Sequence, residues 1–105
     1  MASISEGGAT GHGECVPYAR YGETVGGVEA AIEDMRPAIE AGIDRFTLLE
    51  AMPEGAARNA LDCALIDLEA KRSGRRAADI LGLAGPEPLV TAFTLSLGTP
   101  ESMQA

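Results

Sequence analysis

The chain has 105 residues, which is enough for one domain with a modest core and too few for two. Eight Lys and Arg against sixteen Asp and Glu give a net charge of −8, which argues against a nucleic-acid partner because such a partner needs clustered cations. No stretch approaches the ~20 consecutive apolar residues of a membrane-spanning helix, so we expect no membrane contact and a cytoplasmic protein.

Residues 3–16 are predicted to form a β-hairpin. Gly7 and Gly8 tolerate the positive φ angles that a two-residue turn demands. The returning arm contains Gly11 and Gly13, which weaken it as an independent strand. Only about six residues precede the turn, fewer than a stable arm needs, so we expect more chain before it in the parent protein.

Two helical segments are predicted over residues 24–52. Thr24 is a suitable N-cap, and the apolar residues after it recur at spacings of three and four, as on one face of a helix. Pro37 should kink or divide this helix, and Gly42 should end it. A second, short helix is expected over residues 44–52. The apolar face of the first helix consists of Val25, Val28, Ile32, Met35 and Ile39.

The longest predicted helix begins at Pro53 and Glu54, because proline and an acidic residue both suit a first helical turn. Gly74 should end it, and a short helix is expected over residues 76–81. Cys63 lies in this apolar run and is predicted to be a buried free thiol, since the cysteines fit no metal spacing. The predicted apolar stripe is Ala57, Leu61, Ala64, Leu65 and Leu68.

The composition changes at residues 89–97, where β-branched and apolar residues predict a strand covered on both faces. Residues 98–101 (Gly-Thr-Pro-Glu) then have the composition of a helix start. A single strand and the start of a helix cannot bury both faces of the strand. We therefore expect these residues to open a β/α unit, and the chain to be a piece of a longer protein that is cut at both ends.

Few charged side chains are candidates for chemistry. Lys71 is the only lysine; it forms a favourable i, i+4 pair with Asp67 and is expected to be a solvated surface charge. His12 is the only histidine and has no designated acidic partner or nucleophile, and Glu14 is expected to be exposed on the hairpin. The carboxylates on the predicted helices are expected to face solvent, so no metal site is predicted from Glu29, Glu33, Asp34, Glu40, Asp62, Asp67 and Glu69.

The loop Tyr18-Ala19-Arg20-Tyr21 is the best candidate for ligand recognition. It presents two phenol hydroxyls and one permanent cation on a loop that leads into a helix. A guanidinium group in this position can form two parallel hydrogen bonds with a ligand carboxylate. The alternative is that the tyrosines pack on the domain and Arg20 is solvated.

Three stretches resemble the dipeptide epimerases of the enolase superfamily, in the order in which those enzymes carry them. Residues 13–24 contain Pro-Tyr-x-Arg-Tyr-Gly-Glu and resemble the segment that joins the cap hairpin to the first helix of epimerases of the Ala-Glu dipeptide type. Residues 55–74 resemble the long cap helix, and residues 89–97 resemble the first barrel strand. The resemblance implies the N-terminal capping domain of the mandelate racemase/muconate lactonizing enzyme type. The implied fold is α+β: a hairpin remnant, three to four cap helices and the first strand of a truncated (β/α) barrel.

By this resemblance, residues 1–88 are the capping domain, incomplete at its start, and residues 89–105 open the barrel domain. In such enzymes the barrel supplies two lysines, on opposite sides of the substrate α-carbon, and three acids that hold one Mg²⁺. The cap closes over the pocket, so Arg20 and Tyr21 are expected above the substrate and Thr94 near it on the first barrel strand. No catalytic or metal-binding residue of the family has a counterpart here.

We expect the chain to be the substrate-capping part of a Mg²⁺-dependent isomerase. This enzyme would move a proton at the α-carbon of an Ala-Glu-type dipeptide. Its partner is the barrel of the same protein, an oligomer is compatible with this arrangement, and the chain alone is expected to be inactive. The alternatives are a free-standing small helical interaction module, and the cap of a cycloisomerase or an acylamino-acid racemase. Residues 89–105 favour the enzyme part, because a free-standing module has no use for an apolar strand and the start of a helix.

Overall fold

The computed structural model describes residues 1–85, 87–92 and 98–99. Its first element is an antiparallel hairpin, in which β1 (Ala2–Glu6) and β2 (Ala9–Gly13) pair along their whole lengths. Gly7 and Gly8, with φ angles of 59° and 81°, form the tight turn between them. The predicted hairpin is confirmed, although its second strand ends before residue 16.

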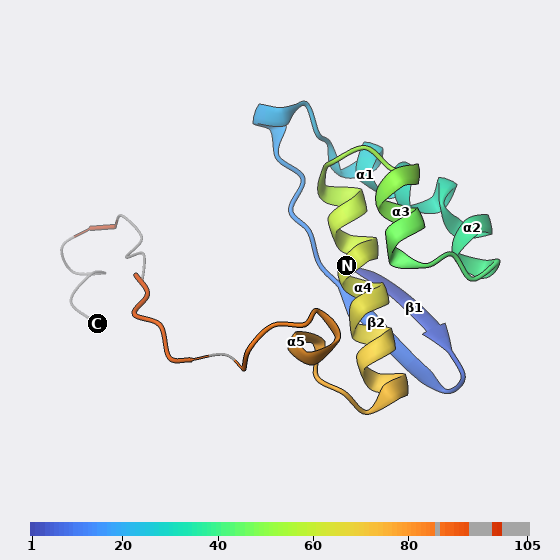
Figure 1. Cartoon of the computed structure of the whole chain (residues 1–105). Helices are drawn as coiled ribbons and strands as arrows, with labels where there is room; N and C mark the ends of the chain where they lie inside the picture. Colours follow the sequence, from blue (N-terminus) through green and yellow to red (C-terminus); the bar gives the residue numbers. More distant parts are fainter. Residues whose placement is uncertain (86, 93–97, 100–105) are drawn as a thin grey trace.

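The other regular elements among the described residues are helices, so the predicted α+β class is confirmed (Figure 1). The Thr24 hydroxyl accepts a hydrogen bond from the Gly27 N–H at 3.1 Å and caps α1, as predicted. Pro37 lies in the first turn of α2 and divides the predicted helix in two. The helices in chain order are η1 (Ala19–Tyr21), α1 (Val25–Asp34), α2 (Arg36–Glu40), α3 (Arg45–Ala51), α4 (Ala56–Ser73) and α5 (Ala77–Ile80).

The long helix α4 begins at Ala56, so the predicted start at Pro53 and Glu54 is wrong. Gly55 occupies the N-cap position with φ 150°, a backbone conformation that other residues rarely adopt. This position has no side chain to cap the helix. The first helical N–H, that of Ala56, instead donates to the carboxylate of Glu23 at 2.7 Å. A contact from a distant segment therefore sets the helix start, which local composition could not reveal.

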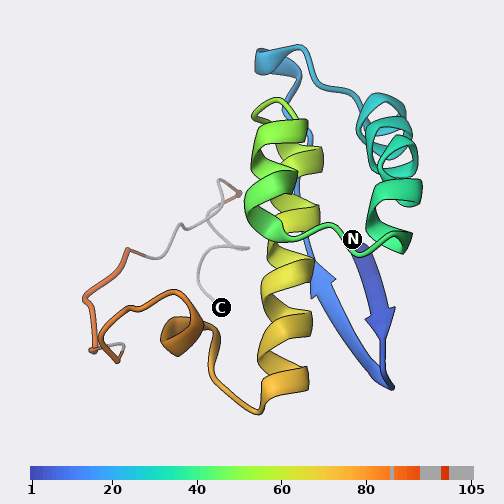
Figure 2. The same ribbon diagram turned by 45° about the vertical axis from the view of Figure 1, so that its right-hand side comes forward.

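Helix α4 is the central element of the core. Strand β2 runs along it, and α1 and α3 also pack against it (Figures 1 and 2). The predicted apolar stripe is confirmed, because four of its members are buried and Leu65 is partly buried against the core. The buried apolar residues are Ala2, Val28, Leu48, Met52, Ala56, Ala57, Ala60, Leu61, Ala64 and Leu68.

The glycines of β2 allow the hairpin to lie directly on the helix backbone. A Cβ atom at Gly11 would stand 2.1 Å from the carbonyl oxygen of Ala64, and one at Gly13 would stand 1.9 Å from that of Ala60. Both distances are far below van der Waals contact. The glycines that weaken β2 as a separate strand are therefore what lets it dock on α4, where the small side chains of Ala60 and Ala64 leave room.

Cys63 is exposed, so the prediction of a buried thiol is wrong. Ala60 and Ala64, four residues apart on α4, form the face in contact with the hairpin. Cys63 precedes Ala64 in sequence and lies beside this face. Apolar residues around Cys63 occur on more than one face of the helix. The helical spacing of apolar residues therefore could not show which of them face the core.

The strand predicted over residues 89–97 is not formed over residues 89–92, which have no regular structure and expose Leu89 and Val90. A strand needs a neighbour, and the only sheet in the described part of the chain is the hairpin itself. Residues 93–97, together with residues 100–105 of the predicted helix start, lie outside the described residues. No helix in the described ranges combines the length and the apolar character needed to cross a membrane.

Candidate functional site

The loop between the hairpin and α1 exposes the residues predicted to recognise a ligand. Its centre is the short helix η1; Tyr18 and Tyr21 are 58% and 77% exposed as whole residues, and their ring centroids lie 6.1 Å apart. The tyrosine rings thus do not pack into the core. Arg20 lies between them in sequence and is exposed, and its side chain makes no hydrogen bond or ion pair within the described residues. Thr94, predicted to lie near the substrate, is outside those residues.

Glu23, which was not among the predicted site residues, connects this loop to the long helix. One carboxylate oxygen accepts the Tyr18 N–H at 2.9 Å, and the other accepts the Ala56 N–H at 2.7 Å. The hydrogen bond from Ala56, followed by that from Tyr18, holds the pKa of Glu23 below its ordinary value of 4.5. The N-terminus of α4 adds a favourable field for a negative charge.

A signal for Glu23 was present in the sequence, but it was distributed over two distant segments. Glu23 closes the motif Pro-Tyr-x-Arg-Tyr-Gly-Glu, and Gly55, which cannot cap a helix with a side chain, precedes the strongest helical pattern in the chain. An acidic residue with no assigned role, Glu23, and a helix start that lacks a capping side chain, at Gly55, would together have suggested that Glu23 caps this helix. The two sites are 33 residues apart, so no local rule connects them.

Lys71 and Asp67 form the predicted i, i+4 pair, with 2.7 Å between Nζ and Oδ2. Lys71 is exposed, as expected for a surface charge, and its ammonium group also donates to the carbonyl of Thr10 at 2.8 Å. Asp67 accepts the backbone N–H of His12 at 2.7 Å. The Lys71 ammonium and then the His12 N–H lower the pKa of Asp67. The only lysine of the chain thus fastens β2 to α4.

Asp62 and Asp67 do not simply face solvent, as had been predicted for them. Asp62 forms a two-pronged ion pair with Arg45 of α3, 3.2 Å between the closest atoms, and both side chains are about four-fifths buried (19% and 20% exposed). Glu14 is exposed, as expected. Within the described residues, no group of three or more His, Cys, Asp or Glu side chains is placed to hold a metal ion. These residues therefore do not fit the Mg²⁺ site of the resemblance.

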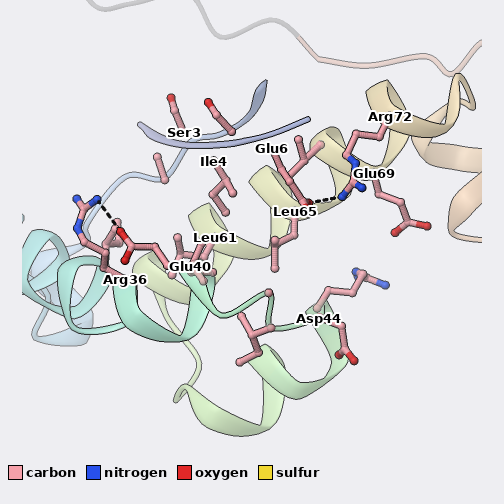
Figure 3. A pocket seen from close by; sticks show the side chains of 18 of the residues that line it. Ser3, Ile4, Glu6, Arg36, Glu40, Asp44, Leu61, Leu65, Glu69 and Arg72 are labelled. Atoms are coloured by element: carbon pink, nitrogen blue, oxygen red, sulfur yellow. Dashed lines mark hydrogen bonds and ion pairs between the residues drawn. The ribbon is translucent and has the colours of Figure 1, made fainter. Parts of the chain in front are cut away.

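A groove of about 1240 Å³ lies beside β1 (Figure 3), and the loop of residues 18–21, called the tyrosine loop below, does not line it. Ile4, Leu61 and Leu65 point into it. An ion pair between Glu6 and Arg72 borders one end. The groove therefore has an apolar floor and a charged rim, and no residue of the tyrosine loop lines it.

Comparison with known families and proteins agrees with this geometry. The family model described as "Mandelate racemase / muconate lactonizing enzyme, N-terminal domain" matches residues 1–82. L-Ala-D/L-Glu epimerase of Escherichia coli (strain K12) is 47% identical over 103 residues, which are 98% of this chain and 32% of that protein. N-acetyl-D-glutamate racemase of a Pseudoalteromonas species is 41% identical over 96 residues, 90% of this chain and 30% of that protein. The chain therefore spans about a third of the length of these relatives.

Two solved structures share the fold. One is an enolase family member from Agrobacterium tumefaciens with homology to dipeptide epimerases, described with bound sodium and L-Ala-L-Glu; it has a TM-score of 0.84 and 55% identity over 96% of this chain and 31% of its own. The other is an L-Ala-D/L-Glu epimerase, with a TM-score of 0.80 and 48% identity over 94% of this chain and 31% of its own.

Proposed function

Because the chain belongs to the mandelate racemase/muconate lactonizing enzyme family, whose N-terminal domain it matches over residues 1–82, we propose that it caps the active site of an epimerase. The substrate is a dipeptide of the Ala-Glu type, and the reaction inverts the configuration at the α-carbon of its glutamyl residue. Two similar proteins are named L-Ala-D/L-Glu epimerase, and a similar structure holds L-Ala-L-Glu. These names support the substrate class.

The observation that carries the proposal is the exposed Arg20 in the same short turn as the exposed Tyr18 and Tyr21. Its guanidinium group is free of ion pairs within the described residues, so it can form two parallel hydrogen bonds with a substrate carboxylate. Tyr21 supplies a hydroxyl beside it. We propose that residues 1–88 form the cap and residues 89–105 open the barrel, with Thr94 near the substrate on its first strand.

The groups that move the proton belong to other parts of the whole protein in this proposal. An epimerisation of this kind needs one amine to take the α-proton and a second to return a proton on the opposite face. The single lysine of this chain is held by Asp67 and the carbonyl of Thr10. The proposal assigns the Mg²⁺ ligands and both lysines to the barrel, and expects the chain alone to be inactive. The cytoplasmic location stays a prediction from the sequence.

A second candidate substrate is an N-acyl amino acid. The similarity to an N-acetyl-D-glutamate racemase favours it, because such a compound also carries a glutamate carboxylate next to an amide. The two candidates differ in the group attached to the glutamate nitrogen, which is an alanyl residue in one and an acetyl group in the other.

A chimera tests the proposal. We would replace the matching third of the Escherichia coli epimerase by this chain, verify its folding by circular dichroism, and assay L-Ala-L-Glu and N-acetyl-L-glutamate with Mg²⁺. We expect epimerisation of the dipeptide with the higher kcat/KM. A higher kcat/KM for N-acetylglutamate would favour the second candidate. A folded chimera that is inactive on both substrates would contradict the proposal.

A further inference from the structure

We propose that Glu23 is the positioning residue of the recognition loop: its carboxylate fixes Tyr18, and with it Arg20 and Tyr21, to the start of α4. What the loop binds rests on the function proposed above. The fixing of the loop by Glu23 does not depend on that function.

Hydrogen bonds between Tyr18 and Glu23 close residues 18–23 into a hydrogen-bonded ring. The Tyr18 N–H donates to the Glu23 carboxylate at 2.9 Å, and the Tyr18 carbonyl accepts the Glu23 N–H at 3.3 Å. Inside this ring, the Tyr21 N–H donates to the Tyr18 carbonyl at 2.9 Å, and Gly22 has a φ angle of 76°. Both backbone groups of Tyr18, at the start of the short turn that presents Arg20, thus form hydrogen bonds with Glu23.

The second carboxylate oxygen connects this ring to the core. It accepts the N–H of Ala56, a buried residue in the first turn of α4. Gly55 makes room for it, because a Cβ atom at that position would stand 2.8 Å from the carboxylate oxygen. The carboxylate therefore satisfies two backbone donors from distant segments, and an ionised acceptor strengthens both hydrogen bonds.

The chain offers a direct readout, because Tyr18 and Tyr21 are its only tyrosines and it has no tryptophan. Tyrosine fluorescence anisotropy of the purified chain therefore reports on this loop alone. Glu23→Gln keeps the shape of the side chain, but its amide nitrogen cannot accept one of the two N–H groups. We expect a lower tyrosine anisotropy in Glu23→Gln, with the far-ultraviolet circular dichroism retained. The matched control is Glu33→Gln, which removes an acid bonded to Arg36 and should leave the anisotropy unchanged.

A titration of the unaltered chain keeps the inference testable if Glu23→Gln fails to fold. The ionised carboxylate holds both N–H groups, and its pKa is below the ordinary 4.5, so the contact is complete at neutral pH and weakens as the pH falls below that value. The amide proton shifts of Tyr18 and Ala56, followed by NMR, should therefore titrate together with one midpoint below 4.5. Two separate midpoints, or no titration of either amide, would overturn the inference.

The chimera separates this inference from the proposed function. With L-Ala-L-Glu, Glu23→Gln should raise KM about tenfold with kcat nearly unchanged, because the loop must then be ordered on binding. A lower anisotropy with an unchanged KM would support the role of Glu23 in fixing the loop and contradict a role of the loop in binding. An unchanged anisotropy in Glu23→Gln would overturn the inference whatever the kinetics.

Discussion

Gly13→Ala should detach the hairpin from α4 and lower the free energy of unfolding by about 3 kcal/mol or more. This is at or above the upper end of the destabilisation that overpacking a core usually causes. The added Cβ would lie 1.9 Å from the carbonyl oxygen of Ala60 and 2.8 Å from the backbone nitrogen of Ala64. Both are backbone atoms of a helix, so neither can move without shifting α4. A domain of this size has a free energy of unfolding of roughly 5–15 kcal/mol, so the loss is a large fraction of it.

Urea unfolding followed by circular dichroism measures this effect. Gly26→Ala is the matched control, because Gly26 lies within α1 and nothing stands within 4 Å of an added Cβ. Since alanine favours a helix over glycine, Gly26→Ala should stabilise the chain by up to about 1 kcal/mol. If Gly13→Ala unfolds at the same urea concentration as the unaltered chain, the close packing of β2 on α4 is incorrect.

Arg20→Ala in the chimera should lower kcat/KM for L-Ala-L-Glu by about 10–100-fold, mostly through KM. The removed guanidinium group would otherwise make charge-assisted hydrogen bonds with the substrate carboxylate, each worth about 1.5–3 kcal/mol. Steady-state kinetics measure the two constants separately. Arg20→Lys should be intermediate, because it keeps the charge but loses the two-pronged geometry.

The control for Arg20 is Arg36→Ala. Arg36 is also an exposed arginine, but it is bonded to Glu33 at 2.8 Å and lines the groove beside β1, not the tyrosine loop. Its removal should leave both kinetic constants close to those of the unaltered chimera. Equal kinetics for Arg20→Ala and the unaltered chimera would remove Arg20 from the substrate site.

Local signals predicted most of the fold. The turn at Gly7 and Gly8, the division of a helix at Pro37 and the helix end at Gly74 each depend on the backbone preferences of one or two residues. The resemblance to the family is confirmed by the match over residues 1–82. Short-range rules are sufficient where the physical cause is itself short-range.

The predictions failed where a distant segment decides the environment of a residue. The start of α4 was placed too early because Glu23 caps it from 33 residues away. Lys71 is a surface charge, as predicted, but its hydrogen bond to the carbonyl of Thr10 on the hairpin could not be predicted from neighbouring residues. Composition could not show that Gly11 and Gly13 serve close packing and not flexibility. The role of Glu23 required the same kind of long-range information.

Hydrogen–deuterium exchange at the substrate α-carbon tests the central claim most directly. The purified chain and the chimera would each be incubated with L-Ala-L-Glu and Mg²⁺ in D₂O, and the glutamyl α-proton followed by NMR. If this chain shapes the pocket and another part of the whole protein moves the proton, the signal will persist with the chain alone and disappear with the chimera. Loss of the α-proton signal with the chain alone, or its persistence with a folded chimera, would contradict that division of roles.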